Sequence, residues 1–151
     1  MSRLTTWALM ICLLFLMGCD PGIAIRQADP PQKGINGGYV EKLNVQVSPY
    51  RTLAYSSIYA ARINLTNRSE LELTIDRIEL ITRHGVHRKV EGTSHGLGSV
   101  IEPNATADVG AWFELKAPLH DTFKNPAKLS VYYHTGINGK EEVVSTKLIS
   151  R

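Results

Sequence analysis

Apolar side chains at every second position are the feature of this sequence that most restricts its fold. The pattern starts after Tyr39 and recurs in LNVQV (43–47), YAARINL (59–65), ATADVGAWFEL (105–115) and LSVYY (129–133). Because successive side chains of a strand point to opposite faces of a sheet, each segment is predicted to be a strand with one buried face. No segment of useful length in this region has helical periodicity. The sequence therefore predicts an all-β domain over residues 39–151.

The segment over residues 71–80 changes the phase of this alternation. Its apolar residues stand at alternate positions up to Ile75 and resume, one position out of step, at Ile78. A one-residue shift would turn every later side chain to the other face of the sheet. We therefore expect a β-bulge or a bend near Asp76-Arg77, or else two strands that meet at a corner.

Residues 132–144, YYHTGINGKEEVV, are typical of a β-hairpin that closes the domain. Asn138 and Gly139 tolerate the positive φ angles that tight hairpin turns require. The segments on either side of them have the composition of strands.

About seven short strands separated by turn residues favour a two-sheet β-sandwich, and a small β-barrel is the alternative. The segments INLTNRSELELTIDRIEL (63–80) and IEPNATADVGAWFEL (101–115) resemble strand and turn units of secreted immunoglobulin-like domains from bacterial envelopes. The resemblance implies an immunoglobulin-like two-sheet sandwich. The cysteine pair that accompanies the buried tryptophan of antibody domains is missing, so Trp112 does not indicate kinship with antibodies.

The N-terminus carries a different kind of signal. Arg3 precedes a mostly apolar run over residues 7–17, which is too short to span a bilayer but has the length of a signal-peptide core. The run ends in LMGC, which resembles the lipobox of bacterial lipoproteins. The resemblance implies a signal peptide over residues 1–18, cleavage between Gly18 and Cys19, a diacylglycerol on the Cys19 sulfur and an acyl chain on its new amine. Several acyl chains hold a protein on a membrane without a spanning helix.

Residues 19–38 are rich in Pro, Gly and polar side chains, so we expect the lipidated Cys19 to be followed by a flexible tether. Asp20, directly after the cysteine, resembles the signal that retains lipoproteins of enteric bacteria in the inner membrane. We expect the protein on the periplasmic face of the inner membrane, with the outer membrane as the alternative. No cofactor is expected besides the covalent lipid.

Cysteine and charge content exclude several classes of protein. The only other cysteine, Cys12, lies in the signal peptide, so the mature chain has no disulfide partner for Cys19 and depends on its core. The formal net charge is +3, and Lys and Arg are scattered among acids along the sequence. A nucleic-acid partner would need a concentrated basic face, so none is expected.

Residues 83–96, RHGVHRKVEGTSHG, place His84, His87 and His95 near one predicted hairpin. Three imidazoles could bind one zinc or copper ion if the turn brings them together. However, structural zinc sites usually have four ligands, and the mature chain has no methionine for a copper(I) site. A solvated loop is the competing interpretation and the one we favour.

No motif indicates catalysis, and we predict that the protein is not an enzyme. The chain has no GxSxG elbow, and the neighbours Glu141 and Glu142 would point to opposite faces of a strand. Trp112, Tyr132 and Tyr133 are the candidates for a recognition surface, because aromatic residues dominate binding hot spots. Tyr132 and Tyr133 must face opposite ways on a strand, so one of them is expected in the core.

Together these features predict a lipid-anchored cell-envelope protein whose β-sandwich is a non-catalytic binding or scaffolding module. Its partner would be another envelope protein, engaged through loops or an exposed strand edge. The alternative is an envelope lipoprotein that binds a metal or small ligand through its histidine loop.

Overall fold

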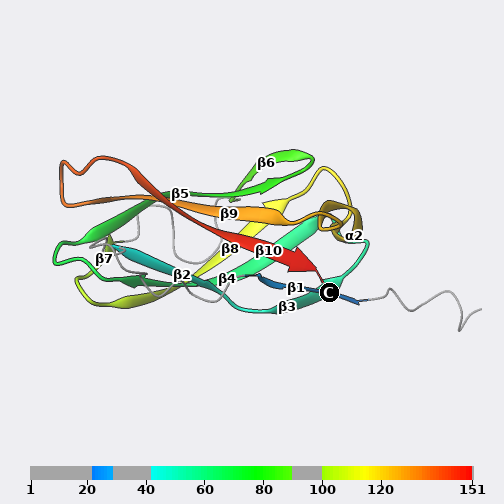
Figure 1. Cartoon of the computed structure of the whole chain (residues 1–151), viewed down its shortest axis with the longest axis horizontal. Coiled ribbons are helices and arrows are strands. Elements are labelled where there is room, and N and C mark those ends of the chain that lie inside the picture. The colour runs from blue at the N-terminus through cyan, green and yellow to red at the C-terminus, as the bar shows by residue number, and fades with distance from the viewer. Residues whose placement is uncertain (1–21, 29–41, 90–99, 151) are drawn as a thin grey trace, which may run out of the picture.

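The computed structural model describes residues 22–28, 42–89 and 100–150. These residues form two β-sheets and a short helix near one end (Figure 1), which confirms the predicted all-β sandwich. In chain order the elements are β1 (Gly22–Gln27), β2 (Leu43–Val47), β3 (Tyr50–Leu53), β4 (Ile58–Asn67), β5 (Leu73–Thr82), β6 (Gly85–Arg88), β7 (Val100–Ile101), β8 (Thr106–Glu114), α2 (Leu119–Thr122), β9 (Ala127–Thr135) and β10 (Glu142–Ser150).

The larger sheet, sheet A, has the strand order β3-β1-β10-β9-β5-β6. The two-residue strand β7 pairs with the start of β5, whereas β6 pairs with its end. Within the sheet β1 lies between β3 and β10, so that Ile25 is opposite both Tyr50 and Ser150. Sheet A therefore joins the first described strand to the last one.

The smaller sheet, sheet B, has the strand order β2-β4-β8. Its central strand β4 is antiparallel to both neighbours, and Ile63 is opposite Val47 on one side and Val109 on the other. Among the described strands, β2 and β8 are thus the two edges of this sheet.

The inward side chains of the two sheets form one continuous core. The helix α2 and the residue after it cover one end of this core with Leu119 and Phe123, and the Phe123 ring meets Tyr59 edge to face at 5.1 Å between centroids. Burial of each large apolar side chain contributes about 1.5–3 kcal/mol, so this layer is the main source of stability. Its largest members include Tyr59, Ile63, Leu65 and Phe113 from sheet B and Ile25, Leu73, Ile78, Leu80 and Leu129 from sheet A.

The predicted bulge in β5 and the predicted closing hairpin are both present, but the turn of the hairpin differs from the expected one. The register between β5 and β9 shifts between Ile75 and Arg77, so the predicted bulge is confirmed. The β9–β10 hairpin is also confirmed, but its turn is not the expected one. The residue with positive φ is Gly136, at 67°, whereas neither Asn138 nor Gly139 has positive φ.

The prediction of a continuous flexible tether over residues 19–38 is wrong for Gly22–Gln27, which form β1. Ile25 is fully buried, and Ile23 packs against the core. This short alternation lies among prolines, glycines and polar residues, whose composition concealed it. The ordered domain therefore begins at residue 22 instead of residue 39 in the part of the chain that the structure describes.

The N-terminal predictions concern other residues. The expected signal peptide over residues 1–18, the lipidation site Cys19 and the sorting residue Asp20 lie outside the described residues, so they stay predictions. Within the described ranges, no helix has both the length and the hydrophobicity needed to cross a membrane.

Candidate binding surface

His87 is a structural residue between the two sheets. It is buried on β6, and its Nδ1 lies 2.9 Å from the carbonyl oxygen of Glu114 at the end of β8. A carbonyl can only accept, so Nδ1 donates to it, and Nε2 lies 3.1 Å from the Thr82 hydroxyl oxygen. Both ring nitrogens therefore have protein partners, and neither is open to a metal ion.

His84 belongs to a surface cluster with Arg83 and Asp121. Its Nε2 lies 3.0 Å from Oδ2 of Asp121 and 3.0 Å from Nε of Arg83, which also contacts the same carboxylate. The hydrogen bond from Arg83 is the main reason that the pKa of Asp121 is lowered, and His84 adds to the effect. The cluster ties the β5–β6 turn to α2.

The structure does not bring the histidines into a metal site where it describes them. His84 faces Asp121, whereas His87 lies in the interior between β6 and β8. Over residues 22–28, 42–89 and 100–150, no group of three or more His, Cys, Asp or Glu side chains could hold a metal ion. The third predicted ligand, His95, lies outside the described residues.

The three aromatic candidates do not share a surface. Tyr133 is buried in the core, so it is the inward member of the Tyr132-Tyr133 pair. Tyr132 lies on the outer face of sheet A, where the Arg77 guanidinium stacks 3.6 Å from its ring centroid. Trp112 is 53% exposed on β8 of sheet B, so it faces solvent on the opposite side of the sandwich.

Trp112 belongs to an apolar patch on the outer face of sheet B. It lies directly opposite Ala60, and Ile58 is the next outward residue along β4. Ile58 is 49% exposed, and both side chains are therefore available to a partner. We call Ile58, Ala60 and Trp112 the Trp112 patch.

Polar residues cover the rest of this face. Asp108 accepts hydrogen bonds from Arg62 at 2.6 Å and from Asn64 at 2.9 Å. Farther along the same strands, the hydroxyls of Thr66 and Thr106 are 3.0 Å apart. One half of the face is thus internally hydrogen-bonded, and the apolar half has the polar rim that is common at binding interfaces.

The strand that carries Trp112 is also an edge. β8 pairs with β4 along one side, and within the described part of the chain no other strand pairs with it. It contains no proline or lysine, which are two of the usual means by which edge strands avoid pairing with other chains. Its side chains and backbone could therefore contact a partner together.

The sequence indicated Trp112 as a candidate, whereas Ile58 was not among the predicted residues. The signal was present, because the buried alternation Tyr59, Ala61, Ile63 leaves Ile58 and Ala60 on the opposite face. An apolar residue on the outward phase of an amphipathic strand is the pattern that would have found it.

The fold and this face define a two-sheet β-sandwich domain with an exposed apolar patch on an edge strand. No protein-family model matches the chain, and neither does any curated protein.

Proposed function

We propose that this protein is a lipid-anchored cell-envelope protein whose β-sandwich is a non-catalytic module for binding another envelope protein through the Trp112 patch. The observation that carries the proposal is the exposure of Trp112 and Ile58, which are diagonal neighbours on the outer face of an edge strand and the strand beside it. Tryptophan is among the residues most enriched in interface hot spots. The resemblance to immunoglobulin-like envelope domains is part of the same proposal, and the two antiparallel sheets over one core support it.

The patch fits a protein partner better than a small ligand. It lies on an outward sheet face, and its rim carries Arg62 and Glu114, the residues opposite Gly110 and Ile58. An apolar centre with a charged rim is the usual anatomy of a protein interface. Apart from the Glu114 carbonyl oxygen, which His87 contacts, the edge of β8 with which no described strand pairs offers backbone groups to which an extended segment of the partner could add as a strand.

A site-specific cross-linking experiment tests the proposed surface. A photoreactive phenylalanine derivative replaces Trp112 in cells, and the matched control carries it at Thr106, which is exposed on the same face of the same strand. We expect one defined adduct from position 112 and much less of it from position 106. Adducts of equal yield from both positions would refute the assignment.

The affinity of the protein is then measured for the partner that the cross-linked adduct identifies. Trp112→Ala is expected to weaken the complex by about 2 kcal/mol or more, roughly thirty-fold in Kd, as for a hot-spot tryptophan. Thr106→Ala should change the affinity by less than about 0.5 kcal/mol. Equal effects of the two variants would show that Trp112 is not central to binding.

The anchor has its own test. The intact mass of membrane-extracted protein should correspond to a chain that begins at Cys19 and carries a diacylglycerol and an acyl chain. Cys19→Ala should leave uncleaved precursor, and unchanged processing of that variant would refute the lipobox. In an organism with the enteric sorting rule, Asp20→Ser should move the protein to the outer membrane.

A further inference from the structure

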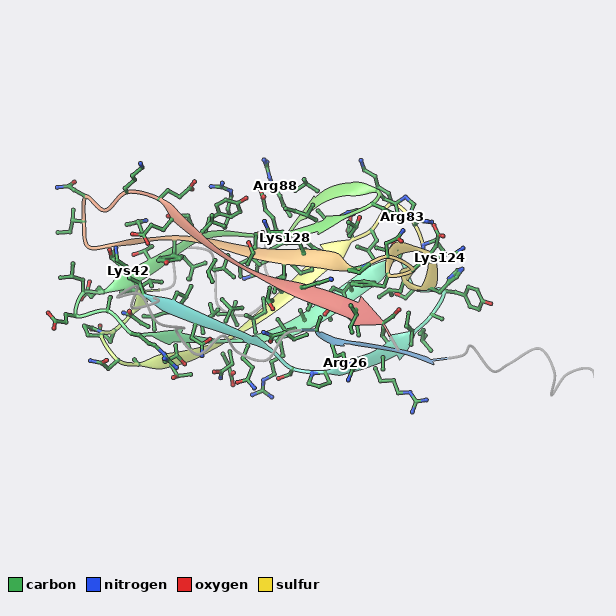
Figure 2. The ribbon with its side chains drawn as sticks, in the orientation of Figure 1. Arg26, Lys42, Arg83, Arg88, Lys124 and Lys128 are labelled. Carbon is green, nitrogen blue, oxygen red and sulfur yellow. The ribbon has the colours of Figure 1, made fainter. Side chains whose placement is uncertain are left out.

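Four cationic side chains share one face of sheet A although they are far apart in the sequence. Their neighbours Ile25, Leu129 and Leu148 point into the core, so alternation turns the cations to the outer face. Figure 2 labels two of them, on β1 and β9. We call this set, which occupies four adjacent strands, the cation row: Arg51 on β3, Arg26 on β1, Lys147 on β10 and Lys128 on β9.

The strand register brings the members of the row together. Lys147 is directly opposite Lys128, and Arg26 and Arg51 follow diagonally on the next two strands, each two positions out of direct register. Adjacent strands are about 4.8 Å apart, so the row crosses roughly 14 Å of the sheet. Like charges that face each other across strands destabilise a sheet, and an anionic partner would remove that penalty.

Among the described residues, no ion pair joins an acid of the sheet to a member of the row. Glu79, on the neighbouring strand β5, contacts Arg77 and Arg88 instead. The only acid in these four strands is Glu142, at the start of β10, where its carboxylate contacts Nζ of Lys42 at 2.5 Å and the Tyr133 hydroxyl at 3.3 Å. Within the ranges that the structure describes, none of the four cations has an acidic partner, and the buried Nε of Arg26 has no hydrogen bond. Cations elsewhere in the domain do contact acids, as Arg62 and Arg83 do.

The row lies close to the expected anchor point along the chain. β1 begins at Gly22, three residues after Cys19, and a fully extended chain of that length spans at most about 11 Å. Leu53 lies directly opposite Gly22 and is 60% exposed on the same outer face as Arg51. A lipid on Cys19 would therefore hold cationic and apolar side chains within reach of the bilayer surface.

We propose that the outer face of β3, β1, β10 and β9 rests on the anionic phospholipid headgroups of the leaflet that holds Cys19. This inference rests on the proposed function, since it requires the lipid anchor. Basic side chains near an anionic leaflet are attracted to it, and an apolar residue such as Leu53 can enter the headgroup region. The Trp112 patch, on the outer face of sheet B, then points away from the membrane and toward a partner.

A proximity measurement in vesicles tests this orientation. The acylated protein carries a fluorophore on Ser145→Cys, on the outer face of β10, or on Thr106→Cys, on the outer face of sheet B. After the signal peptide is removed, the only other cysteine is the acylated Cys19. Vesicles contain phosphatidylglycerol and a nitroxide quencher attached to headgroups. We expect strong quenching at position 145 and little at position 106, and a weaker difference in phosphatidylcholine vesicles or at high salt.

Variants that remove charge test whether the cation row causes this orientation on the membrane. Lys128→Gln/Lys147→Gln is expected to shift the equilibrium away from the bound orientation by about thirty-fold, because each cation near an anionic surface contributes about five-fold. The matched control, Lys116→Gln/Lys140→Gln, removes the same charge from exposed positions outside the row and should leave the quenching unchanged.

The possible failures are distinguishable. Acylated protein with equal quenching at positions 145 and 106, or with quenching insensitive to Lys128→Gln/Lys147→Gln, overturns this inference alone. Protein whose intact mass shows no lipid, and which does not float with the vesicles, overturns the anchor and this inference with it.

Discussion

Asn67 holds the β4–β5 turn against β7, and its replacement gives the sharpest test of the fold. The side chain is fully buried at the end of β4. Its amide nitrogen donates to the carbonyl oxygens of Leu71 at 2.8 Å and Ile101 at 2.9 Å, and its Oδ1 accepts from the backbone N–H of Ser69 at 2.9 Å. The β4–β5 turn and β7, which are distant in sequence, therefore meet at one carboxamide.

Asn67→Ala removes these hydrogen bonds and leaves buried backbone groups without partners. A net contribution of about 1 kcal/mol per hydrogen bond gives a loss of about 3 kcal/mol for the three bonds, and an unpaired buried carbonyl such as that of Ile101 adds to it. The free energy of unfolding, measured by urea denaturation with tryptophan fluorescence, should fall by at least this amount with an unchanged m value.

Asn64 provides the matched control. It lies on the same strand but on the outer face, and its amide makes one hydrogen bond to Asp108 at an exposed position. Asn64→Ala should therefore cost less than about 0.5 kcal/mol. A loss below 1 kcal/mol for Asn67→Ala, or a loss no larger than that of the control, would show that the carboxamide does not hold these segments together.

Three further changes have defined outcomes. Burial raises the pKa of Tyr59, whose buried hydroxyl has no hydrogen-bond partner in the described part of the chain. Tyr59→Phe should therefore leave the stability unchanged or raise it by about 1 kcal/mol in thermal and urea denaturation. Because the contact with Arg83 lowers the pKa of Asp121 below its usual 3.8, the charged carboxylate stabilises the fold above that value. The stability advantage of wild type over Asp121→Asn should then be complete above about pH 5 and vanish as the pH falls through the folded pKa, in denaturation series at different pH values. A Cβ at Gly139 would lie 2.1 Å from the Thr135 carbonyl oxygen, so Gly139→Ala should destabilise the β9–β10 hairpin by about 1–3 kcal/mol in the same denaturation assay.

Each of these expectations can fail in a specific way. A loss above 1 kcal/mol for Tyr59→Phe would reveal a partner for its hydroxyl. A difference between wild type and Asp121→Asn that grows toward low pH would reverse the sign of the argument about Arg83. An Ala at position 139 without effect on stability would mean that the loop over residues 136–141 adjusts freely.

The strands were predictable where alternation is long and one face is buried. β4, β8 and β9 each bury every second side chain, and the register shift near Asp76-Arg77 follows from the change of phase alone. β1 was not predicted, because its two isoleucines give too short a pattern to outweigh the surrounding prolines and glycines. Its strand structure depends on hydrogen bonds from β3 and β10, which are distant in sequence.

Of the two candidate surfaces, the Trp112 patch could be predicted in part from the sequence and the cation row could not. Trp112 could be proposed from residue type, and its exposure follows from the phase of β8. The cation row could not be predicted, since Lys and Arg are scattered along the sequence and only strand order brings Arg51, Arg26, Lys147 and Lys128 together. The roles of His84 and His87 also depended on tertiary contacts, because Asp121 and Glu114 lie far from both in sequence.

The position of β1 between β3 and β10 has a consequence for the order in which the domain can form. Ile25 finds one neighbour at Tyr50 but the other only at Ser150, near the end of the chain. Pairing across such a sequence separation is slow, since a long loop must close before the contact contributes. Until the last strand has arrived, β1 is an unprotected edge and β9 has an open side. During synthesis the sandwich therefore stays incomplete until residues 142–150 have emerged.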